Sequence, residues 1–423
     1  MTKLISRDVH LKRALSFRDI DLIKVITGVR RCGKSCLLEL IRRKIVSEKV
    51  AGRNFVDINL ESKTHKIKNE ADLYKFVKSK IANVGKSYVF IDEPQLLKDW
   101  QLAVNALRLD FDCDIYITGS NAFLLSSELA TLLSGRYVEI KMQPLVFKEY
   151  LTFCNLVAEE DSSILKDEND KLYHVDDVFL NYLKMGGFPA IASLDITQEK
   201  HSAYMSSVYD TVVVKDILNR KRDVGLSKVT DDLLLSRLAE FMADNIGNQM
   251  SNKKISDLLS SSGTKTTNKT IESYVKALHE SFIFYPANRF DLHGKEILKT
   301  NPKHYICDLG LRSKLCGYKF TNIGRMFENA VYLQLLYSGW EVHVGKLYNK
   351  EIDFVAIKDG RTVYIQVTDE MYANETRERE IKPLMSIRNA YEKFIIVRQG
   401  TYEHDVEGIR ILTARDFFLN NKF

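Results

Sequence analysis

The segment TGVRRCGKSC at residues 27–36 restricts the possible folds of this 423-residue chain more than any other feature of its sequence. It contains Gly28, four further residues, and then Gly33, Lys34 and Ser35, which is the pattern of a phosphate-binding loop (P-loop) between a strand and a helix. The apolar run DLIKVIT before the loop predicts a strand, and KSCLLELIRRKI after it has apolar residues at helical spacing. Both flanks fit, so the sequence predicts a strand, a P-loop and a helix in this order.

The chemistry of such a loop assigns roles to its residues. Glycines allow backbone N–H groups to converge on phosphate oxygens, and the positive end of the following helix attracts the same anion. We expect Lys34 to reach the β- and γ-phosphates of ATP and the Ser35 hydroxyl to bind Mg²⁺. The remaining loop residues expected at the nucleotide are Arg30, Arg31, Cys32 and Cys36, with packing as the expected role of both cysteine side chains.

Two adjacent acids follow a later predicted strand in KSYVFIDEPQLL. Asp92 is placed to bind Mg²⁺, directly or through water, and Glu93 to polarise the water that attacks the γ-phosphate. Acids after a strand are commonly no more than solvated side chains. The P-loop upstream favours the catalytic interpretation here.

Three further polar residues are candidates for contact with the γ-phosphate. The predicted strand in CDIYITGSNAFLL ends in Ser120 and Asn121, which could sense this phosphate, although turn or N-cap chemistry explains them equally well. Arg136 precedes another β-rich segment, and an arginine can stabilise the charge of phosphoryl transfer in its own chain or in a neighbouring subunit. A solvated surface arginine is the alternative.

The order of the motifs GVRRCGKS, FIDE, ITGSN, SGRYVEI, QPLVFKEYL and YLKMGGFPA resembles a family of prokaryotic AAA+-type ATPases, related to the archaeal ATPases and the STAND NTPases. The resemblance extends over nearly the whole chain. It implies a parallel αβα core followed by a helical lid, in which Gly187, Phe188 and Pro189 match a turn that approaches the adenine base. A helix-ending turn is the alternative explanation of this segment.

Three short amphipathic segments after the lid, followed by two β-rich segments around a polar turn, predict a winged helix-turn-helix. Lys269 and Lys276 on its third helix and Arg289 and Lys295 on or near its wing could neutralise the phosphates of duplex DNA. A basic run at residues 220–222 lies upstream. Winged helices also dock proteins, so both kinds of partner stay open.

The C-terminal segment resembles the PD-(D/E)xK nuclease superfamily, with Glu328 on a helix, Asp353 on a strand and Gln366 on the next strand. The resemblance implies a second acid and a lysine on that last strand, where this chain has Gln366 and Thr368. A glutamine brings no charge to a metal, and a threonine cannot replace an ammonium that stabilises hydroxide. Lys346 or Lys350 could substitute, but we expect a vestigial site that does not cut DNA.

The fold class is therefore predicted as α/β, with four domains. They are an AAA+-like P-loop ATPase core with an αβα sandwich (1–150), a helical lid (151–228), a winged helix-turn-helix (229–318) and a restriction-endonuclease-like α/β domain (319–423). A hydrophobic fraction of 45%, a net charge of +6 and six scattered cysteines are typical of an intracellular, reduced protein.

Neither a membrane span nor a signal-peptide pattern is evident, so we expect a cytoplasmic protein without a membrane partner. The predicted function is a slow Mg²⁺-dependent ATPase that acts as a switch between its ATP and ADP states. An ATP-regulated nuclease and a non-hydrolysing docking protein are the alternatives.

Overall fold

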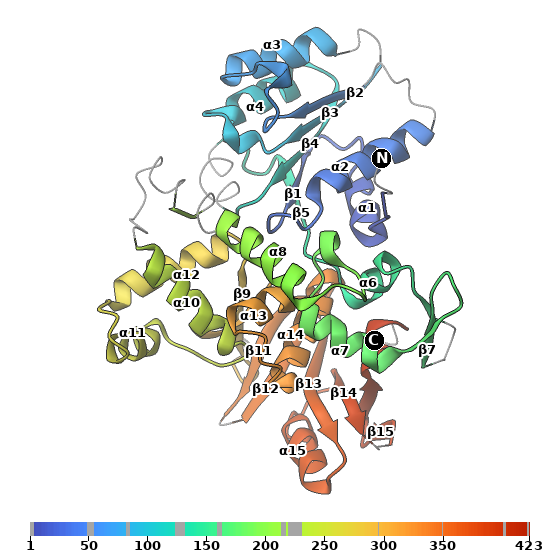
Figure 1. The fold of residues 1–423 in the computed structure, drawn as a ribbon, viewed down its shortest axis with the longest axis vertical. Helices are drawn as coiled ribbons and strands as arrows, with labels where there is room; N and C mark the ends of the chain where they lie inside the picture. Colours follow the sequence, from blue (N-terminus) through green and yellow to red (C-terminus); the bar gives the residue numbers. More distant parts are fainter. Residues whose placement is uncertain are drawn as a thin grey trace. The chain divides into compact units, whose positions relative to one another are not determined.

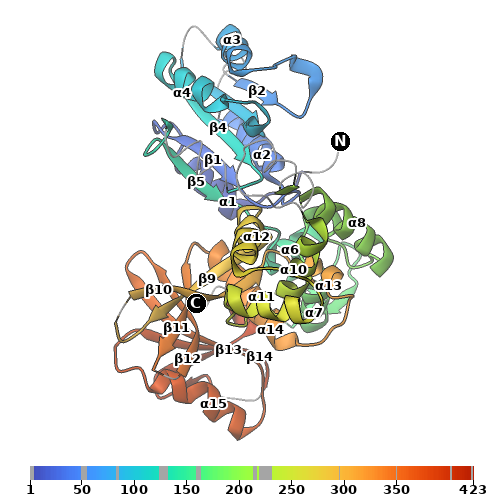
Figure 2. The ribbon, with the colours of Figure 1, turned by 90° about the vertical axis from the view of Figure 1, so that its left-hand side faces the viewer.

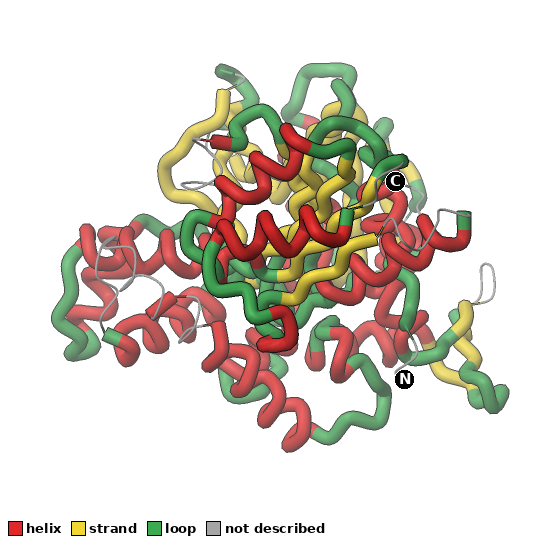
Figure 3. Tube along the Cα trace, turned by 90° about the horizontal axis from the view of Figure 1, so that it is seen from above, coloured by secondary structure: helices red, strands yellow, loops and turns green. Residues whose placement is uncertain are grey.

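The computed structural model describes residues 4–48, 55–81, 85–122, 132–158, 163–212, 217–218, 231–294, 296–348, 350–400, 403–420 and 423. The chain forms two compact units (Figures 1 and 2). The first contains Met1–Gln143 and Glu280–Phe282, and the second contains Pro144–His279 and Ile283–Phe423. Both units combine helices with strands (Figure 3), in agreement with the predicted α/β class.

The first unit contains a parallel sheet with the strand order β2-β3-β4-β1-β5. Its strands are β1 (Ile23–Thr27), β2 (Phe55–Asn59), β3 (Ser87–Asp92), β4 (Cys113–Gly119) and β5 (Tyr137–Lys141). Every residue of β1 and β3 is buried, as expected for a parallel sheet that is covered on both faces. Because β4 lies between β1 and β3, the carboxyl ends of these three strands are neighbours at one edge of the sheet.

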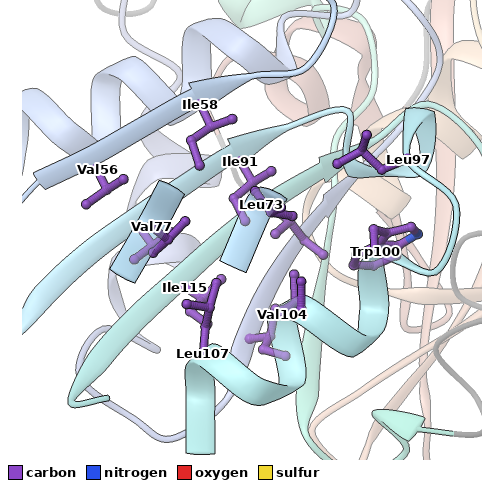
Figure 4. Packing of buried hydrophobic residues seen from close by; sticks show 14 of the residues in the cluster. Val56, Ile58, Leu73, Val77, Ile91, Leu97, Trp100, Val104, Leu107 and Ile115 are labelled. Atoms are coloured by element: carbon purple, nitrogen blue, oxygen red, sulfur yellow. The ribbon is translucent and has the colours of Figure 1, made fainter. Parts of the chain in front are cut away.

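Helices cover both faces of this sheet: α1 (Asp8–Leu15), α2 (Lys34–Ser47), α3 (Glu70–Lys80) and α4 (Trp100–Asp110), with short 3₁₀ turns at η2 (Lys63–His65) and η3 (Pro94–Leu96). Figures 1 and 2 show α3 and α4 on one face and α1 and α2 on the other. Leu73 of α3 and Trp100 of α4 pack against Ile91 and Ile115 in the core between helices and sheet (Figure 4). These apolar contacts fix the sheet whose edge carries the loop.

The second unit contains most of the helices. They are α6 (Phe147–Phe153), α7 (Val175–Met185), α8 (Gln198–Thr211), α10 (Asp232–Asp244), α11 (Asn252–Ser261), α12 (Asn268–Glu280), α13 (Leu309–Leu315), α14 (Ile323–Tyr337), α15 (Asn374–Met385) and α16 (Ala414–Phe418), with the 3₁₀ turn η5 (Pro189–Ile191). Within the described ranges, no helix of either unit has the length and apolar character that a membrane crossing needs.

The main sheet of the second unit has the strand order β10-β9-β11-β12-β13-β14-β16-β15. Its strands are β9 (Phe284–Asp291), β10 (Glu296–Ile306), β11 (Glu341–Leu347), β12 (Lys350–Lys358), β13 (Arg361–Met371), β14 (Glu392–Gly400), β15 (Asp405–Val406) and β16 (Ile409–Thr413). The expected hairpin of the winged helix is present as β9 and β10, after α10, α11 and α12. It does not stand apart, because β9 pairs in parallel with β11 and so joins the C-terminal sheet across the predicted boundary at residue 318.

The segment predicted as a helical lid also contains a small antiparallel sheet. Its strands are β6 (Val157–Ala158), β7 (Ile164–Lys166) and β8 (Leu172–His174). The turn between β7 and β8 is held by Asp167, whose Oδ1 accepts hydrogen bonds from the amides of Asn169 (2.8 Å) and Lys171 (3.0 Å). These local bonds allow a short hairpin to form between α6 and α7.

Candidate nucleotide-binding site

The predicted P-loop connects the carboxyl end of β1 to α2, and its glycines are required by the backbone. Gly28 has φ of 152°, and a Cβ at this position would lie 1.9 Å from the carbonyl oxygen of Met142. Gly33 has φ of 107°, a value that L side chains rarely adopt. The segment after β5 therefore lies directly against the loop, anchored by a hydrogen bond from the Met142 amide to Thr27 O (2.7 Å).

The amino end of α2 presents a row of backbone donors. The first hydrogen bond of the helix runs from the Leu37 amide to Gly33 O (2.9 Å). Among the residues that the structure describes, the Lys34 amide hydrogen-bonds with the Cys32 thiol, and no acceptor is recorded for the amides of Gly33, Ser35 and Cys36. Unpaired amides at a helix N-terminus attract an anion through their N–H groups and through the helix dipole. This arrangement fits the phosphates of a nucleotide.

Lys34 is held inside the loop. Its side chain is buried, and its Nζ donates hydrogen bonds to the carbonyl oxygens of Gly28 (2.9 Å) and Val29 (3.1 Å). The ammonium is therefore next to the amides that would receive the phosphates. Ser35, which would bind Mg²⁺, is exposed at the start of the same helix.

The other loop residues divide into exposed and buried side chains. Cys32 is buried, and burial raises the pKa of its thiol, so packing explains this cysteine as expected. Cys36 and Arg31 are exposed, so packing does not explain Cys36. Arg30 forms an ion pair with Glu61 across 3.5 Å. Contact of these residues with a nucleotide stays a prediction.

Asp92 ends β3 and is oriented by the two neighbouring strands. Thr118 of β4 donates a hydrogen bond from Oγ1 to Asp92 Oδ1 (2.5 Å), and Asn59 of β2 donates from Nδ2 to Asp92 Oδ2 (3.3 Å). Sequence reasoning missed both partners, although each lies at or near the end of a predicted strand. Their contacts leave the buried carboxylate in one orientation, which suits a metal ligand.

Glu93 follows Asp92 with a left-handed backbone, at φ 56° and ψ 50°. Such a conformation is unfavourable for a non-glycine residue and is stabilised here by a hydrogen bond from its amide to Thr118 Oγ1 (2.9 Å). Its Oε2 accepts hydrogen bonds from Ser120 Oγ (3.2 Å) and from Gln95 Nε2. Ser120 and Asn121 are both buried, and Ser120 lies beside Glu93; contact of either residue with the γ-phosphate stays a prediction.

Arg136 lies at the other edge of the sheet. Its carbonyl accepts a hydrogen bond from the amide of Ile23, the first residue of β1, whereas the P-loop follows the last residue of that strand. Its guanidinium bonds to Asn105 Oδ1 (3.2 Å) and to Leu132 O (3.3 Å). The length of β1, about 13 Å at 3.3 Å per residue, separates Arg136 from the loop. Arg136 therefore lies at the end of β1 opposite to the loop, and a catalytic role, in its own chain or in a neighbouring subunit, stays a prediction.

The Gly-Phe-Pro turn belongs to the second unit. The amide of Gly187 donates to Asp308 Oδ2 (2.6 Å), its carbonyl accepts from the amide of Leu145 (2.7 Å), and Phe188 is buried. A Cβ on Gly187 would lie 2.2 Å from Leu145 O. These contacts explain Gly187 without a nucleotide. Contact of Pro189 with adenine stays a prediction.

The candidate DNA-binding residues have different environments. Lys269 and Lys276 are exposed on α12, whereas Arg289 is partly buried in β9, an inner strand between β10 and β11. Arg289 is therefore not on a free wing. Lys295 and the basic run at residues 220–222 lie outside the described residues. DNA binding by this segment stays a prediction.

Glu328, Asp353 and Gln366 lie close together in the second unit. Gln366 Oε1 accepts a hydrogen bond from the Asp353 amide (2.8 Å), and its Nε2 donates to Glu380 Oε2 (3.2 Å). Burial, together with the charge of Glu328, raises the pKa of Asp353 to about 8, while Lys303 opposes this rise. Within the described part of the chain, no group of three or more acidic, histidine or cysteine side chains is arranged to hold a metal ion.

The cation of this cluster is Lys303 from β10, which sequence reasoning missed. Its Nζ lies 3.0 Å from Glu328, 2.7 Å from Glu351 and 3.9 Å from Asp353. Burial alone would lower the pKa of Lys303, but the three carboxylates raise it above its usual value. Lys350, one of the two lysines expected to substitute, instead bonds to Ser386 Oγ (2.5 Å). The negative charge of these carboxylates is thus compensated by the ammonium of Lys303.

Two family models match parts of this chain. A family model described as "AAA domain" matches residues 21–151, and one described as "Domain of unknown function (DUF8612)" matches residues 176–322. The Walker-type ATPase PABY2304 of Pyrococcus abyssi is 15% identical, with a TM-score of 0.44, covering 74% of this chain and 96% of its own. A RuvB variant of Thermotoga maritima is also 15% identical, with a TM-score of 0.31, covering 67% of this chain and 89% of its own.

Two relatives match almost the entire chain. An uncharacterized protein of Haemophilus influenzae is 39% identical over 98% of this chain and 99% of its own length. The uncharacterized protein MJ1544 of Methanocaldococcus jannaschii is 32% identical over 98% of this chain and 86% of its own length. The chain therefore belongs to the family of these two relatives, and its first unit carries an AAA-type P-loop NTPase domain.

Proposed function

We propose that this protein binds ATP with Mg²⁺ in its first unit, hydrolyses it slowly and acts as a nucleotide-driven switch. The observation that supports this proposal most directly is the row of backbone amides at residues 33 to 36, at the start of α2, beside the ammonium of Lys34. Amides and ammonium together provide donors and positive charge for a triphosphate.

The oxygen donors near the loop suit Mg²⁺. Mg²⁺ prefers carboxylate, hydroxyl and water oxygens, and Ser35 and Asp92 would supply the first two. The bound ion would neutralise charge on the β- and γ-phosphates. Thr118 and Asn59 hold the two oxygens of Asp92, so its orientation does not depend on the ion.

Hydrolysis requires a base or a polarising group for water, and Glu93 is the proposed residue. Its backbone amide and the carboxylate of Asp92 share the hydroxyl of Thr118 as a partner. A change in what Asp92 binds would therefore alter the hydrogen bonding of the Glu93 amide through the side chain of Thr118. We propose that this link makes turnover dependent on correct metal binding, which is the local basis of the switch.

Nuclease activity is not part of the proposal. Lys303 already compensates the carboxylates of the C-terminal cluster, and Gln366 hydrogen-bonds the Asp353 amide rather than contributing a charge. A cation that binds there would have to displace a buried ammonium. Incubation of plasmid DNA with the protein and Mg²⁺ or Mn²⁺ should leave the DNA intact, and cleavage that Asp353→Ala abolishes would contradict this expectation.

The proposed ATPase is tested with two variants and a control. Lys34→Ala should weaken binding of ATP and ADP, measured by calorimetry, because the triphosphate loses an ammonium. Glu93→Gln should retain ATP binding but release phosphate at least about 100-fold more slowly, within the range that loss of a general base produces. Lys44→Ala on the same helix, where the side chain is 51% exposed, should behave as the wild type.

The outcomes separate the alternatives. A wild-type protein that binds no nucleotide would refute the proposal. A protein that binds ATP tightly and releases no phosphate would instead be a docking protein that uses ATP as a structural ligand.

A further inference from the structure

We propose that Arg7, which lies outside every motif of the loop, is a positioning residue that holds the P-loop in its phosphate-binding form. The inference rests on the proposed binding of ATP. It assigns a function to the segment that precedes α1, where sequence patterns indicate none.

Arg7 links two backbone segments through one guanidinium. Nη1 donates a hydrogen bond to Cys32 O (3.1 Å) in the loop, and Nη2 donates to Gln143 O (2.9 Å) after β5. The side chain is only 3% exposed. Because the donors of a guanidinium form a rigid planar fork, they fix the separation of the two carbonyl groups.

The hydrogen bond to Cys32 O determines where the next amide points. In a trans peptide the C=O and the following N–H lie in one plane and point in opposite directions. No peptide bond in the described chain is cis, so holding Cys32 O toward Arg7 directs the Gly33 N–H away from it. This N–H is the first amide of the row at residues 33 to 36, and no acceptor is recorded for it within the described part of the chain. Arg7 therefore orients a donor that the phosphates would receive.

The second hydrogen bond acts on the same loop from the other side. Gln143 follows Met142, whose carbonyl oxygen lies against Gly28 and accepts a hydrogen bond from Cys32 Sγ (3.6 Å). By holding both Cys32 and Gln143, the guanidinium keeps the loop pressed against the segment after β5. Loss of the hydrogen bond to Cys32 O would remove the side-chain contact that orients the peptide between Cys32 and Gly33.

A neighbouring side chain anchors α1 without the help of Arg7. His10, on α1, is buried and hydrogen-bonds with the backbone of Lys141 at the end of β5. The start of α1 is thus docked at the carboxyl edge of the sheet independently of Arg7. A variant of Arg7 should consequently retain the helix while it loses the two hydrogen bonds to the backbone.

The test compares Arg7→Gln and Arg7→Lys with Lys12→Gln, a control on the exposed side of α1. Arg7→Gln should weaken the affinity for Mg²⁺–ATP about ten-fold, as the loss of one strong hydrogen bond does, and should raise KM with kcat nearly unchanged. Arg7→Lys, which offers one donor group in place of a fork, should lie between Arg7→Gln and the wild type. A role in stability alone would lower the melting temperature of the free protein but leave the affinity of the folded fraction unchanged.

The result that overturns the inference is a folded Arg7→Gln protein with wild-type affinity and KM. If Arg7→Gln does not fold, Arg7→Lys decides in the same way, since wild-type affinity there would also overturn it. A wild type that fails to bind ATP would refute the proposed function before Arg7 is tested, so the two failures are distinguishable.

Discussion

Replacing Lys303 by methionine would remove the ammonium at the centre of the C-terminal cluster and retain most of the apolar stem of the side chain. Lys303 is 4% exposed, and the side chains of Glu328 and Asp353 are 14% and 18% exposed. Glu351 is 39% exposed, so water screens its share of the interaction. The variant therefore leaves mainly Glu328, which is partly buried, without its cation.

Protonation of the stranded glutamate limits how much unfolding free energy the variant can lose. Breaking a buried ion pair by removing one partner costs about 3–5 kcal/mol. A stranded glutamate can avoid its charge by binding a proton, which at pH 7 costs about 4 kcal/mol for an ordinary glutamate pKa. We therefore expect Lys303→Met to lower the free energy of unfolding of the second unit by about 3–4 kcal/mol at pH 7.

The pH dependence of the stability loss distinguishes an unpaired carboxylate from a loss of packing. In the variant, the folded state holds a carboxyl whose pKa is raised above its unfolded value, so the folded state binds more protons and its stability rises as pH falls. At pH 5 the proton costs only about 1 kcal/mol, and the difference from the wild type should shrink to this value. Loss of packing would be independent of pH.

Urea denaturation is the assay, followed by the fluorescence of Trp340 in a Trp100→Phe background, because the two tryptophans belong to different units. Lys303→Met combined with Glu328→Gln is the control, since removing both charges should restore most of the stability. Wild-type stability of Lys303→Met at pH 7, or a loss that is the same at pH 5, would refute the reasoning.

Two further predictions follow from buried groups. Gly28→Ala should abolish ATP binding and lower the melting temperature, because its Cβ would lie 1.9 Å from Met142 O. The control is Gly135→Ala, which should retain ATP binding because nothing lies within 4 Å of the added Cβ. ATP binding by Gly28→Ala would contradict the loop geometry. Burial lowers the pKa of His279 to about 3 and of His304 to about 4, and the rings bond to each other across 3.0 Å. Both pKa values lie below the unfolded value, so this contribution to stability is complete above pH 6.5 and is lost as pH falls toward 4, by about 2 kcal/mol per histidine at pH 5. The double variant with asparagine at both positions should lack this part of the pH dependence in urea titrations of the second unit. If the unfolding free energy of the double variant changes with pH as steeply as that of the wild type, the two histidines titrate normally.

Sequence reasoning succeeded where the signal is local. The strand before Gly28, the helix after Lys34 and the strand that ends at Asp92 are all present, because apolar periodicity and glycine positions act within a few residues. The same locality explains the three helices and the hairpin between residues 231 and 306.

The missed features depend on contacts between distant segments. Thr118 became a partner of Asp92 only because β4 lies between β1 and β3, and strand order is not contained in the pattern of any one strand. Arg7 and Lys303 reach their partners across the fold in the same way.

The parallel pairing of β9 with β11 also has a consequence for the growing chain on the ribosome. The hairpin of β9 and β10 is synthesised first, and the edge of β9 has no partner until α13, α14 and β11 have emerged. An unpaired strand edge can associate with other chains, and contacts of long sequence separation form slowly. Premature termination after residue 318 would leave this edge permanently open, so such a fragment should aggregate rather than persist as an independent module.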